Sequence, residues 1–106
     1  MKKLLVTVGI LFAASLGASA QTVIPPDVQK LLQKNTCLAC HNVDKKLVGP
    51  SYKEIMQKKK YKPEQIVELI YKPKPSNWPG YPPMAAMANV PKEEALKIAT
   101  LISKLK

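Results

Sequence analysis

The chain's two cysteines and its one histidine lie close together, at Cys37, Cys40 and His41. Thiols at positions i and i+3 can add to the two vinyl groups of one haem, and the histidine that follows can reach the haem iron. On one turn of helix these three side chains face the same side. The spacing therefore predicts one covalently bound haem c per chain, with Cys37 and Cys40 as the thioether residues and His41 as an iron ligand.

Two other kinds of site also use closely spaced cysteines. A thioredoxin-like dithiol opens a helix after a strand, and the sequence shows no alternation of strand and helix patterns. A structural zinc site needs four ligands, whereas this chain holds no cysteine or histidine beyond the three named above. Haem attachment therefore fits the sequence better than either alternative.

A second iron ligand must come from another residue type or be absent, because His41 is the only histidine. Met56 lies in an expected helix, where a methionine ordinarily fills the core. Met84 and Met87 lie in a Pro-rich segment, and the two prolines directly before Met84 restrict a backbone that would hold a weak sulfur–iron bond. We choose Met84 as the distal ligand, with Met87 as the alternative; simple packing over the loop is the other role open to both.

Two aromatic residues precede Met84: Trp78, the only tryptophan, and Tyr81. Large side chains at these positions could form a wall of the cofactor site and reach the haem propionates with an N–H or O–H group. They could equally belong to the core. We therefore count Trp78 among the candidate cofactor-binding residues.

The first 20 residues have the pattern of a cleaved secretory signal peptide. Lys2 and Lys3 precede an apolar run from Leu4 to about Leu16, and small residues end at Ala20. The apolar run is shorter than the roughly 20 residues that a membrane span needs, although an uncleaved anchor stays open. We expect a periplasmic domain over residues 21–106, with no stable membrane insertion after cleavage.

The charge after the expected cleavage site is strongly positive. Fifteen lysines, no arginine and seven acidic residues give a balance of +8. This charge favours acidic partners, and export together with the lack of arginine argues against nucleic acid. The candidate docking residues are Lys45, Lys46, Lys58, Lys59, Lys60, Lys72 and Lys74, although many lysines serve only to solvate a surface.

The expected helices start at prolines or at a capping serine, and each has apolar residues at helical spacing. They cover about residues 25–36, 51–60, 63–71 and 91–104. Five prolines between Lys72 and Asn89 exclude a regular helix or central strand there. The pattern predicts one small all-α domain, about four helices around the cofactor, with a Pro-rich distal loop. Such a domain buries little apolar surface without a cofactor.

Over nearly all of residues 21–106 the sequence resembles a small bacterial class I cytochrome c. The motifs that carry the resemblance are Cys37-Leu38-Ala39-Cys40-His41, Val48-Gly49-Pro50-Ser51-Tyr52, Trp78-Pro79-Gly80-Tyr81-Pro82-Pro83-Met84 and Val90-Pro91-Lys92-Glu93-Glu94-Ala95. The resemblance implies that His41 is the proximal ligand and Met84 the distal one. It also implies that the Pro50 carbonyl accepts a hydrogen bond from the proximal imidazole. The family usually has proline after its axial methionine, whereas this chain has Ala85, Ala86 and a second methionine.

With both axial positions filled, the expected function is transfer of single electrons rather than catalysis at an open iron. The expected partners are membrane-associated redox proteins with acidic docking surfaces, such as a terminal oxidase, a reductase or a dehydrogenase, and we expect a monomer. The alternatives are a five-coordinate haem protein that senses or reduces a small molecule, and a haem subunit of a larger oxidoreductase.

Overall fold

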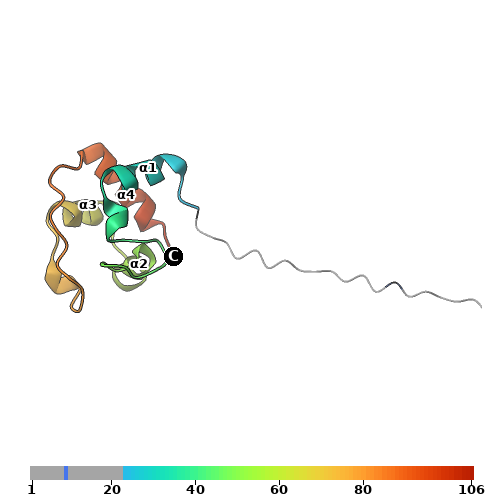
Figure 1. Ribbon diagram of the computed structural model, residues 1–106, viewed down its shortest axis with the longest axis horizontal. Helices are drawn as coiled ribbons and strands as arrows, with labels where there is room; N and C mark the ends of the chain where they lie inside the picture. Colours follow the sequence, from blue (N-terminus) through green and yellow to red (C-terminus); the bar gives the residue numbers. More distant parts are fainter. Residues whose placement is uncertain (1–8, 10–22) are drawn as a thin grey trace, which may run out of the picture.

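The computed structural model describes Gly9 and residues 23–106. Within residues 23–106 the chain forms four α-helices, two short 3-10 turns and no strand (Figure 1). The elements are α1 (Pro26–Lys34), η1 (Cys37–Ala39), α2 (Tyr52–Lys59), α3 (Pro63–Tyr71), η2 (Pro75–Asn77) and α4 (Lys92–Ser103). The prediction of an all-α fold with four helices is confirmed. The predicted signal peptide, residues 1–20, lies outside the described residues apart from Gly9, and it stays a prediction.

Each helix begins where its local sequence favours a helical start. A proline is the first residue of both α1 and α3, where the missing N–H group costs no hydrogen bond. At α2, the Ser51 hydroxyl accepts a hydrogen bond from the Glu54 N–H at 3.1 Å. Helix α4 follows Pro91 and has Glu93 and Glu94 in its first turn, where carboxylates favour the positive end of the helix dipole. The predicted starts are therefore correct to within about a residue.

Helix α4 is the centre of the packing and contacts α1, α2 and α3. Leu32 of α1 and Ile98 of α4 are the largest side chains with almost no exposed surface. The apolar face of α4 is buried at Ala95, Ile98, Ala99 and Ile102. Met56 of α2 is 9% exposed and packs in the same core, which confirms its predicted filling role. None of the described helices is both long and apolar enough to cross a bilayer.

The Pro-rich segment runs from the end of α3 to the start of α4 and contains no α-helix, as predicted. It does include η2, one short turn that begins at a proline, where the fixed φ angle suits a helical start. Hydrogen bonds hold the segment at two points. The Tyr81 hydroxyl donates to a carboxylate oxygen of Glu54 at 2.8 Å, and the Met87 N–H donates to the Ile70 carbonyl at 3.0 Å. The loop is therefore fastened to α2 and α3 and can present side chains at fixed positions.

Candidate haem site

A cavity of about 440 Å³ lies between the Cys37–His41 segment, the Pro-rich loop and the helices α2, α3 and α4. Its volume falls within the ~300–1,000 Å³ of typical ligand and cofactor sites. Six large aliphatic side chains form its helical wall: Ile55, Ile66, Leu69, Ile70, Ile98 and Ile102. Most of the surface is therefore apolar, which suits a flat hydrophobic cofactor.

Cys37 and Cys40 both line this cavity and are free thiols. They are brought together by η1, a single turn that the His41 N–H extends by donating to the Cys37 carbonyl at 3.0 Å. Cys37 is half-buried and Cys40 is exposed. Burial raises the pKa of the Cys37 thiol, while nearby hydrogen-bonding groups, including the Tyr52 hydroxyl, oppose that rise. The structure thus brings the predicted attachment residues to one wall.

The His41 ring also lines the cavity, and its orientation is fixed by its neighbours. Its Nδ1 atom lies 2.8 Å from the Pro50 carbonyl oxygen. Because a carbonyl only accepts, Nδ1 must carry the proton of the neutral ring, and Nε2 keeps the lone pair that binds metals. Burial lowers the pKa of His41, against a smaller opposite effect of the Pro50 hydrogen bond. The ring is therefore held in the protonation state that an iron ligand needs.

Gly49 leaves just enough room for this ring. A Cβ atom built at Gly49 would lie 2.7 Å from Cε1 and 3.0 Å from Nδ1 of His41. The contact is too short, so either the imidazole or the loop would have to move. The sequence showed Gly49 only as part of the motif from Val48 to Tyr52; its close approach to the ring is visible only in the structure.

Replacing Gly49 by alanine is therefore expected to disturb the His41 ring. We expect the haem-loaded variant to lose about 1–3 kcal/mol of unfolding free energy, the usual cost of overpacking, and its imidazole NMR signals to shift. Denaturant titration and one-dimensional NMR measure the two effects. Leu47→Ala, two residues away at a side chain that is 46% exposed, is the control and should change neither. An unchanged Gly49→Ala variant would contradict the close fit.

Tyr52 is a site residue that the sequence did not single out for this role. Its ring stacks on the His41 imidazole, with centroids 5.1 Å apart and planes at 20°. Its hydroxyl is directed to Cys37, and burial followed by the influence of this cysteine raises the pKa of Tyr52. The sequence placed Tyr52 only in the motif that ends at this residue and near the start of an expected helix, because stacking between residues 11 positions apart has no local signature.

Met84 and Met87 both line the cavity. The Met84 side chain is 40% exposed, while Met87 is half-buried beside the backbone anchor to Ile70. The loop therefore brings both candidate thioethers to the site that holds His41. Met56 is in the core and does not line the cavity.

Trp78 and Tyr81 are the aromatic residues that the Pro-rich loop contributes to the cavity wall, and they pack edge to face, with centroids 5.9 Å apart. Both are half-buried. The Tyr81 hydroxyl donates a hydrogen bond to one carboxylate oxygen of Glu54, and the other oxygen accepts a hydrogen bond from Lys58 at 2.8 Å. Lys58 and then Tyr81 hold the pKa of Glu54 below its usual range. The Tyr81 hydroxyl is therefore directed to α2 and belongs to the fastening of the loop.

Lysines cover this aromatic wall from outside. The Lys46 Nζ atom lies 4.6 Å from the centroid of the Tyr81 ring. The Nζ atoms of Lys58 and Lys59 lie 5.9 Å and 5.6 Å from that of Trp78. A lysine over the face of an aromatic ring is attracted by the ring's negative π surface. Three of the seven predicted docking lysines therefore lie beside the cavity wall, and Lys74 lines the cavity itself.

The residues of the cavity fit a covalently attached haem. The wall is apolar, two thiols are spaced for two thioethers, a neutral imidazole is correctly oriented, and the absence of a Cβ at Gly49 makes room for that ring. The Pro-rich loop supplies methionine sulfur, which is the usual partner of histidine as an iron ligand in cytochromes c.

Comparison with known proteins gives a consistent result. The cytochrome c family model matches residues 27–106. The chain is 32% identical to cytochrome c-551 of Allochromatium vinosum, over 79% of this chain and 94% of that protein. It is 38% identical to cytochrome c-552 of Nitrosomonas europaea, over 72% of this chain and 76% of that protein. The crystal structure of Nitrosomonas europaea cytochrome c552 superposes with a TM-score of 0.66 and 34% identity, covering 74% of this chain and 99% of that one.

The family model spans the Cys37–His41 motif, the Pro-rich loop and all four helices except the first residue of α1. These matches agree with the fold and with the haem c chemistry that the cavity supports. The chain therefore belongs to the cytochrome c family, as a small class I member with the motif for one covalently attached haem.

Proposed function

We propose that this protein is an exported carrier of single electrons between membrane-associated redox proteins. The observation that carries the proposal is the single apolar cavity that gathers Cys37, Cys40 and His41 from one segment and two thioethers from another. A haem with a ligand from each segment has no open position for a substrate, so electron transfer is the chemistry that such a site favours.

We assign the distal ligand to Met84 and the proximal ligand to His41. Met84 follows two prolines, and its segment is fastened at Tyr81 and at Met87 on either side. A backbone with restricted angles lowers the entropy cost of holding a weak sulfur ligand in place. The Pro50 carbonyl then fixes the orientation of the His41 ring by accepting a hydrogen bond from its Nδ1–H, and Trp78 would cover the cofactor from the loop side.

A spectroelectrochemical titration of the haem-loaded protein tests this function. We expect one reversible transition that follows a one-electron Nernst curve, with the same spectra in both directions, and we expect no turnover of hydrogen peroxide. Rapid peroxide consumption, or a reduced form altered by oxygen binding, would instead support catalysis or sensing at an open iron.

The partners of a cytochrome c are redox proteins, and we propose that those of this chain have acidic docking surfaces. The segment from Asp44 to Lys62 carries seven lysines against two carboxylates, so more than half of the +8 balance lies in 19 residues. Part of this segment, at Lys46, Lys58 and Lys59, covers the aromatic wall of the cavity. A positive field at this position would steer an acidic partner toward the haem.

Charge reversal at Lys46 and Lys59 should slow reduction of an anionic oxidant. Neither lysine forms an ion pair within the described residues, so Lys46→Glu/Lys59→Glu breaks none there. We expect the rate with ferricyanide to fall roughly threefold to tenfold at low ionic strength and the difference to vanish in high salt. Stopped-flow absorbance measures both.

The matched control is Lys97→Glu/Lys104→Glu, which has the same net charge at two exposed positions, one in α4 and one directly after it, that do not line the cavity. An equal loss of rate in the control would show that only net charge matters and would contradict a localised docking surface.

The proposal also includes export to the periplasm and a monomeric state. Export rests on the signal-like pattern of residues 1–20. Mass spectrometry of the protein purified from cells tests it, because cleavage after Ala20 predicts a mature chain that begins at Gln21. Gel filtration tests the oligomeric state.

A further inference from the structure

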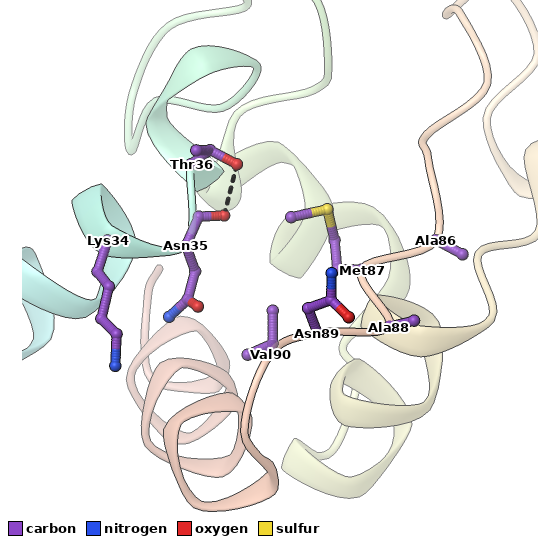
Figure 2. A pocket seen from close by; sticks show the side chains of 8 residues that line it. All are labelled: Lys34, Asn35, Thr36, Ala86, Met87, Ala88, Asn89 and Val90. Carbon is purple, nitrogen blue, oxygen red and sulfur yellow. Dashed lines mark hydrogen bonds between the residues drawn. The ribbon is translucent and has the colours of Figure 1, made fainter.

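A second, smaller pocket opens at the surface beside the haem cavity (Figure 2). Its volume is about 290 Å³, and its walls are residues 34–36, at the C-terminal end of α1, and residues 86–90 of the Pro-rich loop. Most of these residues are exposed, so the pocket is accessible to water and small solutes.

Three residues line both this side pocket and the haem cavity: Thr36, Met87 and Val90. A residue that faces two cavities stands between them, so these three form the partition. Thr36 is small and lies at a left-handed backbone position, with φ 58°. Val90 is buried, and its carbonyl accepts the hydrogen bond of the Tyr71 hydroxyl. Neither has a long side chain that could close a gap.

Met87 provides the long side chain of the partition. Figure 2 shows its thioether rising from the loop toward Thr36, across the space between the loop and the end of α1. Its loop neighbours Ala85, Ala86 and Ala88 carry only a methyl group each. The Met87 N–H is hydrogen-bonded to the Ile70 carbonyl, so the base of this side chain is fixed to the end of α3. Its position therefore depends little on movement of the loop around Met84.

We propose that Met87 is a positioning residue that separates the distal side of the haem from solvent in the side pocket, and so protects the bond between Met84 and iron. This inference rests on the proposed function, because it takes Met84 as the ligand. The sulfur–iron bond is weak, so water or a small neutral ligand that reaches the distal side competes with it. Truncation of Met87 would join the two cavities and give such molecules a direct route.

The test is imidazole binding to the oxidised, haem-loaded protein, followed by stopped-flow absorbance at increasing imidazole concentration. At low concentration, the slope of rate against concentration reports access to the iron. At high concentration, the plateau reports how fast Met84 leaves the iron. Met87→Ala is expected to raise the slope on the order of tenfold, as a barrier lower by about 1.4 kcal/mol would, and to leave the plateau unchanged.

Met87→Leu is the matched variant, because leucine fills nearly the same volume without sulfur. It should behave like the wild type. Met87→Val removes less volume than Met87→Ala, so it should perturb the fold less, and its slope should be intermediate. Wild-type slopes in both truncated variants would overturn the proposal, and so would a Met87→Leu variant as open as Met87→Ala. A changed plateau with an unchanged slope would also overturn it, since Met87 would then act on the Met84 bond itself.

The weak far-red absorption band of sulfur-ligated oxidised haem keeps this test separate from the proposed function. If the band is missing from the wild type, the His41–Met84 ligation fails. If it is present in the wild type and lost in Met87→Leu, Met87 is the ligand and the partition role fails. If all Met87 variants keep the band, the slopes alone decide the proposal.

Discussion

Replacement of both Cys37 and Cys40 by alanine is expected to leave the chain without covalent haem and without a cooperative fold. The six aliphatic side chains of the cavity wall belong to helices α2, α3 and α4, and a bound haem would cover the surface that Ile55, Leu69 and Ile70 leave exposed. Burying one such side chain is worth about 1.5–3 kcal/mol, whereas a whole domain is stable by only about 5–15 kcal/mol. The cofactor is therefore a major part of the core of this small domain.

Two measurements check this expectation. Covalent haem is detected by its peroxidase stain on a denaturing gel, and folding is followed by circular dichroism during heating. The control is Ala39→Ser, which changes an exposed residue between the two cysteines and should keep both the haem and the cooperative transition. A sharp thermal transition in the haem-free double variant would show that the polypeptide forms its core alone.

Met84→Ala is expected to open the iron of the haem-loaded protein. Loss of the thioether should remove the far-red band of the oxidised form, lower the reduction potential and allow the reduced form to bind carbon monoxide stoichiometrically. The potential falls because a methionine ligand favours the reduced state of iron more than water does. Optical spectroscopy with and without carbon monoxide, together with a potentiometric titration, measures all three effects.

Met87→Ala is the comparison for Met84→Ala, because both residues line the cavity from the same loop. It should keep the far-red band and stay insensitive to carbon monoxide on the time scale of mixing. The reverse result, with the band kept in Met84→Ala and lost in Met87→Ala, would assign the iron to Met87 and reverse the two roles proposed above.

The helices were predictable because their signals are local. Pro26 and Pro63 start helices, Ser51 caps one, and apolar residues recur at helical spacing along α4. The roles of the two thiols and the imidazole were equally predictable, since their chemistry depends on spacing within five residues.

Several other contacts of the site join distant segments and were not predictable. The stacking of Tyr52 on His41, the bond of Tyr81 to Glu54 and the lysines over Trp78 all join residues that no periodic pattern relates. The different surroundings of Met84 and Met87 were not predictable for the same reason. Both lie in a loop without periodicity, and only the structure shows that Met87 also borders a second pocket.

Addition of carbon monoxide to the dithionite-reduced, haem-loaded wild-type protein tests the central claim most directly. If His41 and Met84 occupy both axial positions, as the account predicts, the reduced spectrum will not change on mixing, and its sharp α and β bands will remain. If the carbon monoxide spectrum forms at once and in full, the iron has an open position, and the electron-carrier account is contradicted.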